Sequence, residues 1–273
     1  MNGTLIPQAE APTQTAQTKG EKPPRKKGLN SNQIKLIAIA AMTVDHLLDV
    51  IYPGYPKVWW IIGLHIIGRL TAPTMWFMIA EGYSHTHNLK KYISRLFLFA
   101  IVSHFAYNFA FGIPFIPFQS SYVNQTSVIW PLAWGVVAIA LCDPSKTKLR
   151  KWQQAALVLL ICALTFCADW SCTAVLAILA IYSHRGNFKR QVAEMMLYVA
   201  FYALGYFFFA DKVYGIIQLF AIICVPLVKS YNGERGSWKG MKWFFYIYYP
   251  AHLIVCGFIR LWLHGNVATV VGG

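Results

Sequence analysis

Charged residues are scarce in this chain, and acidic residues are the scarcest. Only 12% of the 273 residues are charged, with 10 Asp and Glu against 24 Lys and Arg, whereas soluble domains average about 25% charged residues. Hydrophobic residues make up 57% of the chain. This composition excludes an ordinary soluble protein.

The formal net charge of +14 at pH 7 raises the alternative of a nucleic-acid-binding protein. The positions of the basic residues decide against it. They lie in short clusters between long apolar runs such as 34–51 and 192–210, and these runs approach the roughly 20 residues that span a bilayer core. We therefore expect a membrane protein with basic loops, the lipid bilayer as its partner and no nucleic acid.

The first thirty residues contain no apolar run, and they are rich in Gln, Thr, Ala and Pro. We expect no cleavable signal peptide here, and a segment of this composition does not bury enough surface to fold. The predicted organisation is a disordered, basic cytoplasmic tail at 1–30, a single transmembrane domain at 31–265 and a short tail at 266–273.

The chain has few cysteines and shows no metal-ligand spacing. Most of its six cysteines lie inside apolar runs, so burial is the favoured interpretation. Cys167 and Cys172 flank a short polar turn and could form a disulfide, although bridges over such short loops are often strained. His85 and His87 are half of a metal site without a nearby third ligand. We expect neither a disulfide framework nor a metal.

Apolar runs separated by charged loops predict an all-α bundle of about nine transmembrane spans. The spans are expected at 34–52, 58–80, 93–112, 124–142, 153–168, 170–183, 192–210, 213–229 and 243–263. The fifth and sixth are short and could instead form one re-entrant hairpin around Asp169, but two spans fit the charge pattern better. With the amino terminus in the cytoplasm, nearly all basic loop residues are cytoplasmic and only Lys57 and Lys212 lie outside, as the positive-inside rule requires.

Ionisable residues inside the spans are the main functional signal, because each costs several kcal/mol and normally faces the bundle interior. Asp45 and His46 are neighbours in the first span, toward its outer end. Adjacent helical residues point about 100° apart, so Asp45 does not orient His46 directly and each needs its own partner. His46 either serves as a general base or belongs to a structural hydrogen-bonded pair.

The second span carries His65 and Arg69 one turn apart and ends at Glu81. The guanidinium of Arg69 either clamps a phosphate or carboxylate of a ligand or pairs with Asp45 or Asp49 of the first span. His65 is more simply interpreted as an interior polar group with its hydrogen bonds satisfied.

The last span carries a polar stripe on an otherwise apolar helix. Tyr249, His252, Cys256 and Arg260 follow one another at steps of three or four residues, which places them on one face. An interior-facing functional stripe is expected there. Asp169 lies in the turn between the fifth and sixth spans, where a capping or turn role is the simpler interpretation.

Together these residues could assemble a base, an orienting group and an anion clamp in one cavity. Such a set suits acyl transfer, in which the base deprotonates an amine or hydroxyl acceptor and the cation holds the donor's phosphates or the developing oxyanion. A proton relay in a transporter would use the same set. The residues alone leave both functions open.

Several motifs resemble the TraX family, in family order from about residue 29 to 258. They are Asp45-His46 after Gln33-Ile34-Lys35, Gly68-Arg69-Leu70 through Pro73 to Glu81-Gly82-Tyr83-Ser84-His85-Thr86, Lys91-Tyr92-Ile93-Ser94-Arg95-Leu96, Asp169, Tyr231-Asn232-Gly233-Glu234-Arg235-Gly236 and Phe244-Phe245-Tyr246-Ile247-Tyr248-Tyr249-Pro250-Ala251-His252-Leu253. The fifth and the last of these motifs are the most specific.

The resemblance implies a multi-pass acetyltransferase of the bacterial inner membrane. Its donor would be acetyl-CoA from the cytoplasm, and its acceptor a pilin-like protein amino terminus or a cell-surface polymer. It implies His46 as the acyl-transfer base and Arg69 as the donor or oxyanion contact, with Asp45 and His252 as further catalytic candidates. The other candidates, for substrate or donor binding, are Glu81, Arg95, Asp169, Tyr249 and Asn232. The alternatives are a transporter and a non-catalytic factor in conjugation or surface-appendage assembly.

Overall fold

The computed structural model describes residues 27–238 and 240–270. Most of the predicted tail, residues 1–26, and the last three residues of the predicted carboxyl-terminal tail lie outside the described residues. The described residues form helices and two isolated β-bridges, so the all-α prediction is confirmed.

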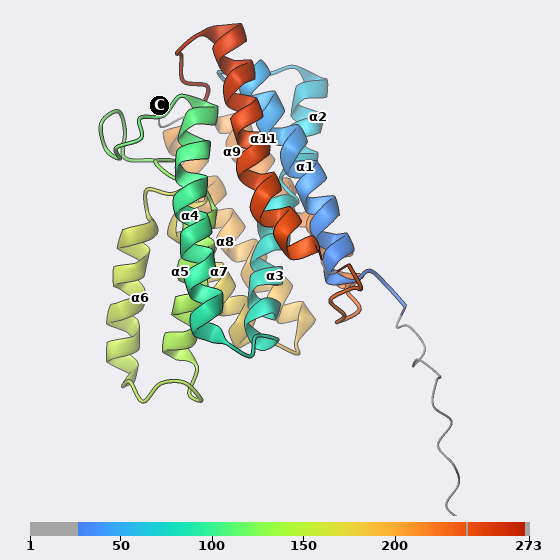
Figure 1. Ribbon diagram of the computed structural model, residues 1–273, viewed down its shortest axis with the longest axis vertical. Coiled ribbons are helices and arrows are strands. Elements are labelled where there is room, and N and C mark those ends of the chain that lie inside the picture. The colour runs from blue at the N-terminus through green and yellow to red at the C-terminus, as the bar shows by residue number, and fades with distance from the viewer. Residues whose placement is uncertain (1–26, 239, 271–273) are drawn as a thin grey trace, which may run out of the picture.

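The helices stand roughly along the long axis of the molecule (Figure 1). They are α1 (Ser31–Ile51), α2 (Trp59–Gly68), α3 (Thr71–Ser84), α4 (Leu89–Phe111), α5 (Ile129–Cys142), α6 (Lys151–Thr165), α7 (Ser171–Ser183), α8 (Phe188–Phe209), α9 (Lys212–Leu219), the 3-10 helix η1 (Phe220–Ile223), α10 (Cys224–Lys229) and α11 (Met241–His264). Helix α11 packs against α4 and α1, and α7 packs between α5, α3 and α8, while α6 contacts only α5 and α7 closely. The interior is therefore enclosed by α1, α3, α4, α7, α8 and α11.

Five helical segments of the described chain are long and apolar enough to cross a membrane. They are Trp59–Ser84, Leu89–Phe111, Phe188–Phe209, Lys212–Lys229 and Trp243–His264. The apolar helices α5, α6 and α7 have 14, 15 and 13 residues, about 20 Å at 1.5 Å per residue, which is less than the roughly 30 Å of a bilayer core. The structure supports a transmembrane bundle, whereas nine full crossings and the cytoplasmic amino terminus stay predictions.

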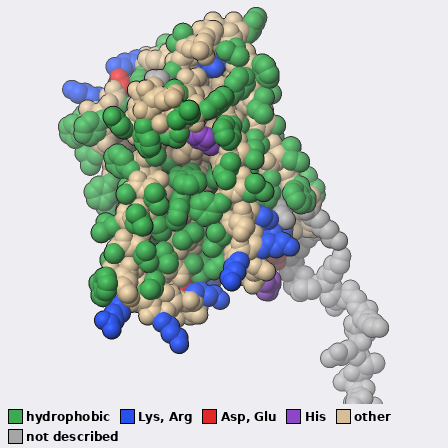
Figure 2. Space-filling view, turned by 60° about the vertical axis from the view of Figure 1, so that its left-hand side comes forward, with side chains coloured by type: hydrophobic (Ala, Val, Ile, Leu, Met, Phe, Trp, Pro, Cys, Tyr) green, Lys and Arg blue, Asp and Glu red, His purple; other side chains and the backbone are tan. Residues whose placement is uncertain are grey.

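The outer surface agrees with a lipid environment. Figure 2 shows hydrophobic side chains over the middle of one face, with Lys and Arg toward its lower edge and also near its top. Large apolar side chains such as Phe209 and Trp262 are 89% and 85% exposed, and a soluble monomer rarely shows so many exposed apolar groups in continuous patches.

The second predicted span is broken. The break lies at Arg69 and Leu70, between α2 and α3, although Trp59–Ser84 still counts as one apolar segment. Pro73 supplies the cause, because proline has no N–H to bond the carbonyl of Arg69, four residues earlier, and its ring crowds that carbonyl. The break places the guanidinium of Arg69 inside the bundle.

All six cysteines are free thiols, so the bridge considered between Cys167 and Cys172 is not formed. Cys224 and Cys256 are buried and the other four are partly buried. Burial, the favoured interpretation of these residues, applies to all of them in some degree.

Candidate functional site

A cavity of about 530 Å³ follows one face of α1 through the bundle. Its lining takes residues from α1 at steps of three or four, namely Lys35, Ile39, Met42, Asp45, His46, Asp49 and, just after the helix, Tyr52. Exposed residues line both ends, including Arg235 at the first end and Tyr52 at the other. The volume lies in the range of small-molecule sites.

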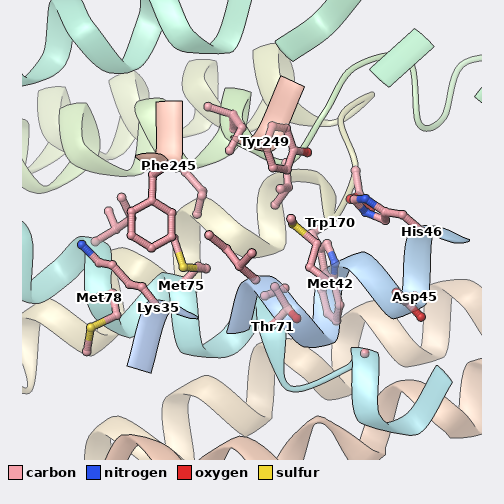
Figure 3. Close-up of a pocket in the computed structure, with 18 of the residues that line it drawn as sticks. Lys35, Met42, Asp45, His46, Thr71, Met75, Met78, Trp170, Phe245 and Tyr249 are labelled. Atoms are coloured by element: carbon pink, nitrogen blue, oxygen red, sulfur yellow. The ribbon is translucent and has the colours of Figure 1, made fainter. Parts of the chain in front are cut away.

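The cavity changes character along its length (Figure 3). Lys35 and Phe245 lie at one end and Asp45 and His46 at the other, with Met42 and other apolar side chains between them. We call the first end the basic mouth, formed by Lys35, Arg95 and Arg235. We call the other end the buried polar cluster, formed by Asp45, His46, His65, Arg69, Gln218 and His252.

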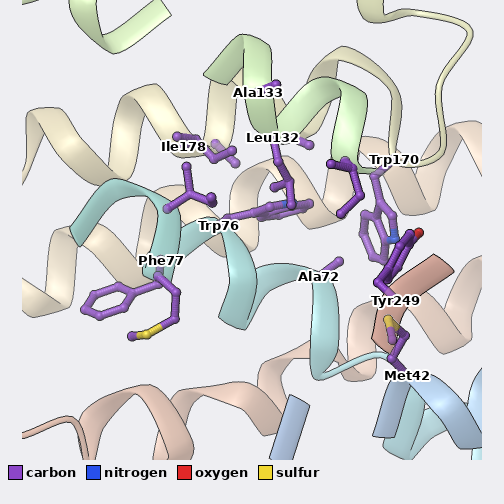
Figure 4. Close-up of a cluster of buried hydrophobic side chains, with 14 of the residues drawn as sticks. Met42, Ala72, Trp76, Phe77, Leu132, Ala133, Trp170, Ile178 and Tyr249 are labelled. Carbon is purple, nitrogen blue, oxygen red and sulfur yellow. The ribbon is translucent and has the colours of Figure 1, made fainter. Parts of the chain in front are cut away.

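An apolar core backs this middle section. Figure 4 shows Trp76 of α3 packed among Leu132 of α5, Ile178 of α7 and their neighbours. Trp76 and Ile178 are fully buried, and the ring of Trp76 meets the edge of Trp170 at 5.2 Å between centroids. This packing gives the cavity a rigid wall.

His46 is held by His252. The Nδ1 of His46 lies 2.9 Å from the Nε2 of His252, and the Nδ1 of His252 lies 3.1 Å from the carbonyl oxygen of Tyr248. A carbonyl only accepts, so the Nδ1 of His252 carries a proton and, in the neutral ring, its Nε2 accepts from His46. The Nε2 of His46 then holds a lone pair, and no described residue bonds it.

Asp45 has separate partners, as the helical geometry predicts. One carboxylate oxygen accepts from the Nδ1 of His65 at 2.8 Å, and the other accepts from Nη2 of Arg69. The guanidinium also donates to the side chain of Gln218 at 3.1 Å and to the carbonyl of His65 at 3.3 Å. Of the two interpretations of Arg69, pairing within the protein is the one that the structure shows.

Gly68 permits this contact. A Cβ at Gly68 would lie 2.5 Å from the Cβ of Asp45, so any larger residue would push the end of α2 away from α1. The glycine therefore sets the distance between the two helices at the polar cluster.

Asp169 and Trp170 line the cavity from a strained turn. Trp170 and Ser171 both have positive φ, 61° and 50°, which is costly for residues other than glycine. The turn is held by the backbone N–H of Asp169, which donates to the carbonyl of Thr126 at 2.9 Å. The ring of Trp170 stacks on Tyr202 at 4.4 Å between centroids, so the strain fixes an indole and a carboxylate at the cavity.

Glu81 lines the cavity near the basic mouth, but its charge is already paired. Both of its carboxylate oxygens accept from Arg185, at 3.0 and 3.3 Å, and His85 lies 3.6 Å away. Hydrogen bonding to Glu81 raises the pKa of the Arg185 guanidinium. Glu81 therefore ties α3 to the loop after α7.

The remaining predicted site residues divide between the cavity and its surroundings. Arg95 and Tyr249 line the cavity, and His252 lies behind His46. Asn232 does not line the cavity. Its side chain accepts from the backbone N–H of Glu234 at 2.9 Å and so shapes the turn after α10.

Arg260 completes the polar stripe of the last span but lies away from the polar cluster. Its guanidinium donates to the carbonyls of Phe109, Gly265 and Val267 at 3.0–3.2 Å. It fastens the end of α4 to the segment after α11.

Sequence reasoning missed Gln218, Trp170 and Arg235 as parts of the site. A lone glutamine in the apolar eighth span was a usable signal, because a buried polar group needs a partner. Arg235 was recognised as part of the motif at 231–236 but was given no binding role. In the described part of the chain, no three His, Cys, Asp or Glu side chains are grouped so as to hold a metal ion.

Comparison with known proteins adds a family and a relative. The model of the TraX protein family matches residues 30–260. The probable fimbrial assembly protein FimC, serogroup H1, of Dichelobacter nodosus is 28% identical over 253 residues, which cover 85% of this chain and 96% of that protein. No solved structure matches the chain.

Proposed function

Since the chain belongs to the TraX family, we propose that it is a membrane acetyltransferase, with His46 as general base and acetyl-CoA as donor. The acceptor is a protein amino terminus, such as that of a pilin-like subunit, or a hydroxyl of a surface polymer. The protein lies in the bacterial inner membrane.

One observation carries this proposal: His46 lines the cavity, its Nδ1 is held by His252, and no described residue bonds its Nε2. In the transfer, the acceptor nitrogen or oxygen attacks the thioester carbonyl carbon and gives its proton to Nε2 of His46. The carbon–sulfur bond then breaks, and the leaving thiolate takes that proton from the imidazolium. Throughout, the Nδ1 proton of His46 stays hydrogen-bonded to His252.

His252 in this scheme is a positioning residue. It selects the tautomer of His46 that leaves Nε2 unprotonated, and it accepts a hydrogen bond that stabilises the imidazolium. Asp45 and Arg69 act one step further away, because their pairing fixes α2 against α1 beside the base.

The orientation of the cavity follows from the positive-inside rule. We place the basic mouth at the cytoplasmic face, where acetyl-CoA is available, and the end near Tyr52 at the outer face. Because exposed residues line both ends of the cavity, we propose that donor and acceptor approach His46 from opposite sides of the membrane.

The name of the FimC relative favours a second candidate. That protein is named as a probable fimbrial assembly protein, so a non-catalytic assembly factor of a pilus or fimbria is the competing proposal. A transporter that uses the polar cluster as a proton relay is the third.

The deciding experiment measures free thiol released from acetyl-CoA by the purified protein, with and without an amino-terminal pilin peptide. His46→Ala is expected to abolish release while the thermal unfolding curve stays near that of the parent. His104→Ala is the matched control, because His104 bonds the carbonyl of Phe115 and does not line the cavity.

The same assay tests the positioning role of His252. His252→Gln keeps an oxygen that accepts from His46, whereas His252→Phe removes the acceptor. We expect turnover to fall at least about tenfold further in the Phe variant, with an altered pH–rate profile. Full turnover in His46→Ala removes His46 from the mechanism. No turnover in the parent or in any variant, while a mutant-sensitive solute flux is measured, rejects the acetyltransferase.

A further inference from the structure

We propose that the basic mouth is a phosphate-binding subsite, and that it holds the phosphate groups of the donor while the donor's linker extends along α1 to His46. This inference rests on the proposed function, because it assigns the part of the cavity that the chemistry at His46 does not use.

The three cations of the mouth come from different parts of the chain and lack acidic partners. Lys35 lies on α1, Arg95 on α4 and Arg235 in the loop before α11, and all three line the same end of the cavity. Among the described residues, no carboxylate lies within ion-pair distance of any of them. Glu81, the nearby lining carboxylate, is taken by Arg185.

Two of the cations also repel each other. Lys35 and Arg235 are close enough for their charges to interact unfavourably, and the buried Nε of Arg95 has no hydrogen-bond acceptor. Gathering like charges without counter-charges costs free energy, and a bound anion with several oxygen acceptors removes that cost. Phosphate groups match both needs, because they carry multiple charges and accept hydrogen bonds from guanidinium groups.

The mouth is a built structure rather than a set of free surface side chains. The loop that carries Arg235 is bonded to the start of α1: the N–H of Leu29 donates to Ser230 and the N–H of Ser31 donates to Glu234, both at 2.8 Å. Gly236 has a φ of +91°, and a Cβ there would lie 2.6 Å from the side chain of Asn30. The loop therefore holds Arg235 beside Lys35.

The direction of Lys35 is also fixed. Its ammonium lies 5.6 Å from the centre of the Phe245 ring, a cation–π contact. Figure 3 shows Lys35 beside Phe245, at the end of the cavity opposite to His46.

The spacing along α1 sets the length of the ligand. Lys35 precedes His46 by eleven residues, which is about 16 Å at 1.5 Å per residue, or roughly the reach of five extended residues. The cavity between them is lined by Ile39, Met42 and Met75, so a charged linker would be costly there. The donor class that fits is a phosphorylated head joined by an uncharged, amide-containing arm to a thioester, as in CoA thioesters.

The phosphate could arrive in two ways, on a water-soluble CoA thioester or on the headgroup of an anionic membrane lipid, and the experiment separates them. The full chain is placed in phosphatidylcholine nanodiscs, and binding of CoA, of 3′,5′-ADP and of pantetheine is measured. CoA is expected to bind best, 3′,5′-ADP more weakly but measurably, and pantetheine, which has the arm without phosphates, at least about tenfold more weakly than CoA.

Charge removal at the mouth is the critical arm. Lys35→Gln and Arg235→Gln are each expected to weaken CoA binding about three- to tenfold, and the double variant more than tenfold, with a smaller dependence on salt. Pantetheine binding stays unchanged in these variants. Arg190→Gln is the matched control, because Arg190 is exposed and does not line the cavity.

Each outcome decides the inference. Equal affinity for pantetheine and CoA, or unchanged CoA binding in the double variant, overturns it, even where His46-dependent transfer persists and the proposed function stands. If the variants instead change only the retention of phosphatidylglycerol in mixed-lipid nanodiscs, the phosphate belongs to a lipid and the donor assignment is overturned. Mouth-dependent CoA binding without any acetyl transfer supports the subsite and counts against the proposed function alone.

Discussion

The two ends of the cavity treat charge in opposite ways. At the buried polar cluster, Asp45 and Arg69 satisfy each other, with His65 and Gln218 completing their hydrogen bonds. At the basic mouth, no carboxylate of the described residues lies within ion-pair distance of Lys35, Arg95 or Arg235, because the nearby Glu81 is paired with Arg185. A buried charge is tolerated when it is paired. The charges of the polar cluster are paired within the protein, whereas the cations of the mouth lack a counter-charge. Arg69, the strongest candidate for an anion clamp by sequence, belongs to the polar cluster, where its charge is already paired.

The largest effect on the free energy of unfolding is expected from breaking the ion pair between Asp45 and Arg69 in the polar cluster. Arg69→Met leaves the carboxylate of Asp45, whose side chain is 12% exposed, with His65 as its remaining partner. We expect a loss of about 3–5 kcal/mol in unfolding free energy, measured by thermal unfolding in one detergent. The double variant Asp45→Asn/Arg69→Met should recover most of it, since removing both charges leaves none unpaired. A double variant as unstable as the single one would show that the pair is not the source.

A smaller effect is expected from moving the two helices apart without changing any charge. Gly68→Ala places a methyl group against Asp45, whereas Gly63→Ala, on the same helix, meets nothing within 4 Å. We expect Gly68→Ala to destabilise by about 1–3 kcal/mol, and Gly63→Ala to stabilise by up to about 1 kcal/mol through helix propensity. The comparison of melting temperatures of these two variants isolates the contact, and equal shifts would contradict it.

Much of the fold could be predicted from the sequence, because apolar runs mark where helices lie. The first, third and seventh predicted spans begin at 34, 93 and 192, and the helices begin three or four residues earlier, at Ser31, Leu89 and Phe188. In each case an asparagine side chain accepts a backbone N–H of the first turn and caps the helix, so the helix extends beyond the apolar run into polar residues. A hydropathy pattern does not record that extension.

The site was only half predictable, for a different reason. The sequence predicts that Asp45 and His46 point in different directions on one helix, so that each needs a partner of its own. The identity of the partners does not, because His252 lies 206 residues from His46 along the chain and only the packing of α11 against α1 joins them. Of the basic mouth, only Arg95 was predicted, because the sequence does not show that Lys35 of α1 and Arg235 of the loop before α11 line the same cavity.

The smallest effect, and the sharpest test of the comparison, is expected at the mouth. Lys35→Met removes a cation that has no carboxylate partner, relieves its repulsion with Arg235 and keeps an apolar stem against Phe245. Unfolding free energy should therefore stay within about 0.5 kcal/mol of the parent or rise, opposite in sign to Arg69→Met although both changes delete one positive charge. Added CoA should raise the melting temperature of the parent more than that of the variant, because at one ligand concentration a tighter-binding ligand stabilises the folded state more. A loss above about 1 kcal/mol of unfolding free energy in Lys35→Met would mean that the charge of Lys35 stabilises the fold as that of Arg69 does. The two ends of the cavity would then not differ in how they pair charge.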